Sequence, residues 1–326
     1  MQDKKAIRLA PFIIKTLLVV LTFGFLYFEI FQKHEMNDLV HLYRDSYLEH
    51  SLLYWTLLLL MLVNWSFETK KWMYMLPEGL SQGFFESFKA VWTGVAVSLF
   101  TPNRVGEFGG RMLCFEPGDR VKAVSASLAG SLGQLTSTML FGIIGGTWYL
   151  IYGGNDRFTG PSWLPFLSIV IFALILILYF NIRIFSHWLE KRRWHKLLSE
   201  TMEVLSSYSR DKLFVNLWFS ALRYLVFALQ MGLALYVLVE FVDFKIIGLI
   251  AGIFTYFLFQ TALPSIALSE IGVRGAVLAF LLAHTIVGDD ITGLVLAGTL
   301  IWFINIIIPA IVGAFFLLRV KIKLAP

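Results

Sequence analysis

Two short segments of this chain carry charged residues at the same spacing within sequence that is otherwise apolar. The first reads Glu107-x-Gly-x-Arg111, with Arg104 shortly before it, and the second reads Glu270-x-Gly-x-Arg274. A guanidinium in a sheltered site can bind a phosphate group through two parallel hydrogen bonds, and glycines allow close approach to the backbone. The two segments are therefore candidate sites for an anionic, phosphate-containing group.

The glutamates of these segments have two possible roles. Glu107 and Arg111, like Glu270 and Arg274, stand at the i,i+4 spacing of helical ion pairs, which would only hold each segment together. Alternatively, the carboxylates position the arginines of a binding site or exchange protons. Three arginines face two glutamates in these motifs. The surplus positive charge favours binding of an external anion.

A polar stripe is expected on one apolar helix of the second half. Asn216, Arg223 and Gln230 recur at every seventh position, which places them on one helix face with Arg223 near mid-membrane. Interhelical hydrogen bonding is the favoured role for the two amides, whereas Arg223 is interpreted as a binding residue. The weaker stripe of Asn64, Glu68 and Lys71 suits an interfacial position. The candidate binding set, which includes two neutral hydrogen-bonding residues, is Arg104, Glu107, Arg111, Arg223, Gln230, Ser269, Glu270 and Arg274.

Composition places the chain in a membrane. Hydrophobic residues make up 58% and charged residues 15%, which leaves too little polar surface for a soluble globule. The net charge of +5 is interpreted as cytoplasmic anchoring charge rather than a nucleic-acid site, because lysines and arginines cluster beside apolar segments. The sequence has a single cysteine and no recognisable metalloprotease, nucleophile-elbow or P-loop motif. We therefore assign no catalytic residue, metal or cofactor.

Charge also predicts the topology. Positive clusters put both termini and the loop 183–212 on the cytoplasmic side. The segments 83–118 and 246–287 must then each enter and leave by one face, as re-entrant hairpins, and residues 32–50 form an outer loop with a short surface helix. Full spans are expected at 11–31, 52–67, 121–152, 163–182, 214–239 and 291–318.

The two halves look like inverted copies of one unit. Residues 128–132 match 296–300, and Gly145 matches Gly313 at the same offset. An odd number of spans per half turns the second copy upside down. The predicted fold is an all-α, polytopic membrane helix bundle with an inverted-topology repeat, about six full spans and two re-entrant hairpins. It forms one membrane domain, 1–326, with a first repeat at 1–155 and an inverted second repeat at 161–326.

The first charged segment, Thr101 to Arg111, resembles a signature of the lysylphosphatidylglycerol synthase transmembrane-region family of flippase-like membrane proteins. Pro264 to Arg274 resembles the second signature of that family. It differs at Leu268-Ser269, where a glycine pair is common, and at Gly275, where an acidic residue often follows the arginine. The resemblance implies translocation of a lipid. In the best-known members this module is fused to an aminoacyl-transfer domain, which we do not recognise here.

The leading hypothesis is a lipid flippase or scramblase that moves a lipid with an anionic phosphate-containing headgroup between the leaflets of a bacterial cytoplasmic (inner) membrane. A transporter-type protein is favoured over an enzyme. Two alternatives stay open: a membrane-embedded transferase acting on a lipid phosphate, with Glu107 or Glu270 as general base, and a non-transporting lipid-binding partner of an envelope-biosynthesis complex. The expected partners are membrane lipids with phosphate headgroups, with a homodimer as a possible assembly and no nucleic acid.

Overall fold

The computed structural model describes residues 36–99, 101, 104–152, 161, 163–184, 196–239, 246–262, 270–282 and 292–320. Within these ranges the chain is helical and contains no strand, as the predicted all-α class requires. The helices are α2 (Met36–Met75), α3 (Phe84–Ser98), α4 (Gly106–Met112), η2 (Pro117–Asp119), α5 (Arg120–Tyr152), α6 (Leu164–Phe180), α8 (Lys196–Ser207), α9 (Arg210–Leu238), α10 (Ile246–Ala262), α11 (Glu270–Leu282), α12 (Thr292–Trp302), the π-helix η5 (Phe303–Ile307) and α13 (Ile308–Arg319).

Four helical stretches in the described ranges are long and apolar enough to cross a membrane. They are Ser46–Met75, Pro117–Tyr149, Arg210–Leu238 and Thr292–Arg319, and each contains most or all of a predicted span. The apolar helix α6 has 17 residues and falls short of these four, and the predicted span at 11–31 lies outside the described residues. The chain is a multi-pass membrane protein, and the full number of spans stays a prediction.

Several hydroxyl side chains within these long helices form hydrogen bonds within their own helix. Thr69 donates to the Trp65 carbonyl and Ser127 to the Ala123 carbonyl, each one turn back along its own helix. Such internal bonding keeps hydroxyl groups compatible with an apolar environment. The same apolar sequence can therefore form spanning helices and still contain serine and threonine.

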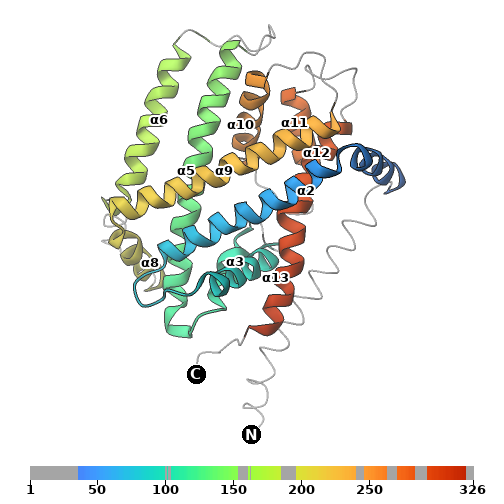
Figure 1. Cartoon of the computed structure of the whole chain (residues 1–326). Coiled ribbons are helices and arrows are strands. Elements are labelled where there is room, and N and C mark those ends of the chain that lie inside the picture. The colour runs from blue at the N-terminus through green and yellow to red at the C-terminus, as the bar shows by residue number, and fades with distance from the viewer. Residues whose placement is uncertain are drawn as a thin grey trace.

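Helices α2 and α9 run antiparallel along each other through the centre of the molecule (Figure 1). Gln230 donates to the Leu57 carbonyl at 2.9 Å, while Arg223, two turns earlier in α9, reaches Asn64 further along α2. Helix α2 is kinked at His50, where φ is −123° and ψ is 30°. The helix expected before residue 50 is thus present from Met36. Its place on the membrane surface stays a prediction.

Helices α3 and α4 pack together within the first predicted hairpin. They have 15 and 7 residues, and neither approaches the roughly 20 residues that a spanning helix needs. A Cβ at Gly110 would lie 2.6 Å from the Gly94 Cα, so only glycine permits this approach. The turn between them is stabilised by Thr101, whose hydroxyl accepts from the Gly106 N–H at 2.7 Å. The second predicted hairpin likewise contains two short helices, α10 and α11, of 17 and 13 residues.

The two halves exchange contacts through a matching pair of glycines. A Cβ at Gly313 in α13 would lie 3.2 Å from the Thr93 nitrogen of α3, and a Cβ at Gly145 in α5 would lie 3.2 Å from the Thr255 nitrogen of α10. Each long helix therefore packs against the short helix of the other half.

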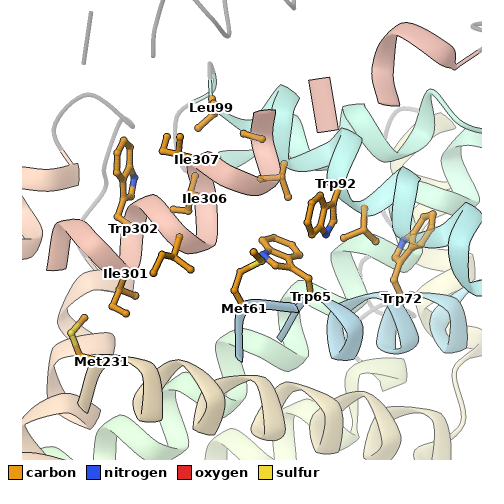
Figure 2. Close-up of a cluster of buried hydrophobic side chains, with 14 of the residues drawn as sticks. Met61, Trp65, Trp72, Trp92, Leu99, Met231, Ile301, Trp302, Ile306 and Ile307 are labelled. Carbon is orange, nitrogen blue, oxygen red and sulfur yellow. The ribbon is translucent and has the colours of Figure 1, made fainter. Parts of the chain in front are cut away.

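A cluster of buried aromatic and aliphatic side chains lies between α2, α3 and the α12–η5 segment (Figure 2). Trp65 meets Trp92 edge to face with ring centroids 6.5 Å apart. Trp72 donates through its indole N–H to the Ser127 hydroxyl at 2.9 Å. Trp65 and Trp302 also line a polar cavity, so this core forms one wall of the candidate site.

Candidate functional site

A cavity of about 520 Å³ lies among α2, α4, α5, α9, α10, α11 and the α12–η5 segment. Sites for small ligands typically measure about 300 to 1,000 Å³, so the cavity can hold a lipid headgroup. Its apolar wall contains Trp65, Phe108, Leu135, Tyr224, Phe227, Phe257, Ala262, Ile301, Trp302 and Ile306. Its polar side contains Glu68, Lys71, Arg104, Glu107, Ser131, Gln134, Thr138, Arg223, Gln260, Thr261, Arg274 and Asn305.

Glu68 of α2 is the centre of an ion-pair network beside this cavity. One carboxylate oxygen, Oε1, accepts from Arg111 Nη2 at 2.7 Å. The other, Oε2, pairs with Lys71 Nζ at 2.7 Å and with Arg223 Nη1. Three elements, α2, α4 and α9, thus bring cations to one carboxylate.

Asn64, Glu68 and Lys71, whose stripe suits an interfacial position in the sequence, are buried inside the protein. Their exposed fractions are 0%, 5% and 1%, because α9 lies along α2 and α4 packs beside it. The signal for this burial was the i, i+4, i+7 spacing of the three polar residues on an apolar helix. Their partners, however, come from segments far away in the sequence.

Arg111 joins two carboxylates of the first half, Glu68 and Glu107. It forms the expected i,i+4 ion pair with Glu107 and also donates to Glu68. Its guanidinium lies 5.5 Å from the centre of the Trp72 ring, a cation–π arrangement. Arg111 is 2% exposed and lies behind the cavity wall rather than on it.

Arg223 lines the cavity with its guanidinium held on several sides. Nε donates to Asn64 Oδ1 at 2.7 Å, and Nη1 donates to Glu68 and, at 3.4 Å, to Gln134. The guanidinium carbon lies 5.3 Å from the centre of the Trp65 ring. Nη2 makes no hydrogen bond with the described residues. Arg223, interpreted from the sequence as a binding residue, also has a protein partner, Glu68, that lies outside both charged motifs.

Arg104 is held differently. It lines the cavity, and its Nη2 is buried without a hydrogen-bond partner in the described part of the chain. No carboxylate of that part forms an ion pair with it. Its φ of 59° lies in the left-handed region, which costs a non-glycine residue of order 1 to 3 kcal/mol and is common at functional sites. Arg104 is the cavity cation with the fewest protein partners among the described side chains.

The second half contributes Arg274 from α11. The guanidinium is buried and lines the cavity, and the Gln260 amide oxygen accepts from it at 2.7 to 3.1 Å. Glu270 begins α11, but its side chain and all of Ser269 lie outside the described residues. The binding roles expected for these two residues stay predictions.

The two amides of the α9 stripe point to other helices. Gln230 donates to the Leu57 carbonyl and Asn216 donates to Ala129 O at 2.8 Å and to the Tyr179 hydroxyl at 2.9 Å. Neither lines the cavity. Both amides make interhelical hydrogen bonds, which is the role the sequence favours for them. A binding role for Gln230 has no support in this arrangement.

The described side chains give the cavity an excess of positive charge. Its lining contains Lys71, Arg104, Arg223 and Arg274 against two carboxylates, Glu68 and Glu107. Charges attract more strongly in a cavity sheltered by protein than in water, so this excess of positive charge favours an anion over a cation. Within the described ranges, no group of three His, Cys, Asp or Glu residues is arranged to hold a metal ion.

Comparison with known proteins adds a family assignment. The family model for the lysylphosphatidylglycerol synthase TM region matches residues 12–320, nearly the whole chain. No match was found among curated proteins or among solved structures. The matched range contains every cavity residue described above, and the chain belongs to the lysylphosphatidylglycerol synthase TM region family.

Proposed function

We propose that this protein moves a lipid with an anionic, phosphate-containing headgroup between the leaflets of a bacterial inner membrane. The observation that carries the proposal is the excess of cationic over anionic side chains among the described residues of a cavity bounded by helices apolar enough to span the bilayer. A bare charge at the bilayer centre costs about 2.5 to 3.5 kcal/mol even on the lenient insertion scale. A cationic cavity offsets that cost for an anionic headgroup.

The residues that line the cavity suggest which parts of the lipid would contact the protein and which would stay in the membrane. Arg104, Arg223 and Arg274 would bind the phosphate, with Lys71 as an additional positive charge. Phe227 and the other aromatic residues of the wall would contact the glycerol region, and the acyl chains would stay in the lipid. Membership of this family supports a lipid as the ligand.

We further propose that transport uses an inverted repeat, with both termini cytoplasmic. The exchanged contacts of Gly145 and Gly313 support this, because each of these matching glycines meets a threonine, Thr255 or Thr93, in the short helix of the opposite half. Movement of one repeat against the other would open the cavity to each leaflet in turn.

The test is translocation of fluorescent phosphatidylglycerol in proteoliposomes containing the purified protein. Arg104→Ala should slow the movement about tenfold or more, because a charged hydrogen bond in a sheltered site contributes about 1.5 to 3 kcal/mol. Arg44→Ala is the matched control, since Arg44 is exposed on α2 and lies outside the cavity. Equal rates in the two variants, both folded, would refute the proposal.

The same experiment separates the two alternatives. A changed headgroup in the extracted lipid, with a donor supplied, would indicate a transferase. Binding of phosphatidylglycerol without movement would indicate a lipid-binding partner of another complex.

A further inference from the structure

We propose that Glu68 acts as an internal competitor of the lipid phosphate, occupying the cations that the headgroup must engage. The inference rests on the proposed function, because it concerns how the same cavity exchanges one anion for another. It assigns a role in headgroup binding to a residue outside both charged motifs.

The geometry of the network supports this competition. The Glu68 carboxylate presents two oxygens to Arg111, Lys71 and Arg223, and a phosphate diester would present two oxygens of similar charge and reach. Arg223 is the shared partner. Its Nη1 is engaged by Glu68, and Nη2, on the same guanidinium, makes no hydrogen bond with the described residues. A phosphate at Nη2 would therefore lie beside the Glu68 carboxylate and repel it.

Glu68 can also release Arg223 without losing all of its ion-pair partners. If a phosphate takes over Arg223, the Glu68 carboxylate still has Lys71 and Arg111 at 2.7 Å each. Breaking a buried pair is strongly unfavourable when a charge is left alone, and here neither charge would be. Exchange of partners can thus occur without an unpaired buried ion.

The exchange has a consequence for the contact between helices. Among the described residues, Arg223 of α9 and Arg111 of α4 are joined through Glu68 of α2. When a phosphate engages Arg223, the ionic link from α9 to α2 and α4 weakens. Headgroup binding would in this way loosen the second half of the protein from the first.

The experiment measures how lipid shifts the melting temperature of Glu68→Gln in detergent. Without lipid, the variant should melt below the wild-type protein, because three buried cations lose their shared carboxylate. Dioctanoyl phosphatidic acid should then stabilise it at a concentration about tenfold or more lower than the wild-type protein requires. Dioctanoylglycerol, which lacks the phosphate, should stabilise neither protein. Glu86→Gln, which removes an exposed carboxylate paired with Lys89 at 2.9 Å, should behave like the wild-type protein.

A second pair of variants tests the same proposal if Glu68→Gln does not fold. Lys71→Met removes one cation, and the double variant Glu68→Gln/Lys71→Met removes the carboxylate as well, so fewer charges are left without partners. The double variant should respond to less phosphatidic acid than Lys71→Met alone. Equal half-saturating concentrations with and without Glu68 would overturn the competition.

Three further outcomes separate this inference from the proposed function. Stabilisation by phosphatidic acid but not by equal inorganic phosphate, at a lower concentration without Glu68, supports both. Stabilisation by inorganic phosphate alone, still stronger without Glu68, supports the competition and contradicts a lipid ligand. No response of any variant to either compound contradicts the anion site itself, and both proposals with it.

Discussion

At the scale of single residues, two of the cavity's arginines, Arg223 and Arg104, differ in the number of hydrogen bonds that they form with the protein. Arg223 is bound by Asn64, Glu68 and Gln134, whereas Arg104 has a buried Nη2 without a partner among the described residues. The first arginine contributes to the structure as well as to the site. Removing the charge of Arg104 should therefore break few interactions with the described part of the protein.

This contrast predicts different stabilities for the two alanine variants. Arg223→Ala should lower the free energy of unfolding by about 1.5 to 3 kcal/mol, because it removes the charged hydrogen bonds to Asn64 and Glu68. Arg104→Ala should lower it by less than about 1 kcal/mol. Both should reduce lipid translocation. Unfolding in a detergent titration and the proteoliposome assay measure the two effects. Equal destabilisation would contradict the finding that Arg104 has the fewest partners among the described cavity cations.

The ion pair of Glu107 with Arg111 predicts how transport responds to pH. Glu107→Gln should reduce stability by about 1 to 3 kcal/mol, because the amide keeps a hydrogen-bond acceptor but loses the charge. The pH dependence of translocation should stay that of the wild-type protein. A folded Glu107→Gln protein that loses its pH response would show instead that Glu107 carries a proton, and Glu86→Gln serves as the control.

At the scale of elements, the short helices α3 and α4 set the position of the charged residues. Glu107 and Arg111 are on α4, a helix of seven residues that is too short to be stable alone and depends on packing. Its contact with α3 relies on Gly110 facing Gly94. A change in the contact between α3 and α4 should therefore move the side chains of Glu107 and Arg111.

Two neighbouring glycines provide a matched test of this contact. A Cβ at Gly110 would lie 2.6 Å from the Gly94 Cα, whereas a Cβ at Gly109 would meet nothing within 4 Å. Gly110→Ala should therefore cost about 1 to 3 kcal/mol of stability and lower translocation, and Gly109→Ala should do neither. Detergent unfolding and lipid movement of both variants provide the comparison. Similar behaviour of the two would mean that α3 and α4 can separate without effect.

At the scale of the whole molecule, the cavity lies where the two halves meet. Arg104 and Glu107 reach it from the first half, and Gln260 and Arg274 reach it from the second. The short helix of each half packs on a long helix of the other, α3 on α13 and α10 on α5. Such an arrangement suits two repeats that move against each other around a shared site.

The proposed inversion predicts that the two short-helix pairs begin on opposite membrane faces. Ser81 stands exposed before α3, and Ile246 is exposed at the start of α10. Ser81→Cys should react with an impermeant thiol reagent from the cytoplasmic side and Ile246→Cys from the outer side. Labelling of both from one side would contradict the inverted repeat.

The native cysteine should interfere little with this measurement. Burial raises the pKa of the Cys114 thiol to about 12, so the reactive thiolate is scarce near neutral pH. Cys114→Ala still provides the cleaner parent protein, and it should show no labelling from either side.

The sequence alone determined the features that depend on composition and local spacing. The membrane class, the four long apolar helices and the ion pair of Glu107 with Arg111 follow from hydrophobicity and helical periodicity, which act over one or a few turns. The recurrence of Gly145 and Gly313 also appeared in the sequence. Their exchanged contacts did not, because nothing local specifies which helix a glycine meets.

The tertiary structure decided which charges share a partner. Glu68 and Lys71 suit an interface when only their own helix is considered, yet the packing of α4 and α9 on α2 buries them and brings Arg111 and Arg223 to one carboxylate. Sequence spacing therefore singled out Arg104, Arg223 and Arg274 but neither Lys71 nor the balance of charges around the cavity. The strength of an ion pair depends on distance and burial, and both arise only when helices distant in the chain pack together.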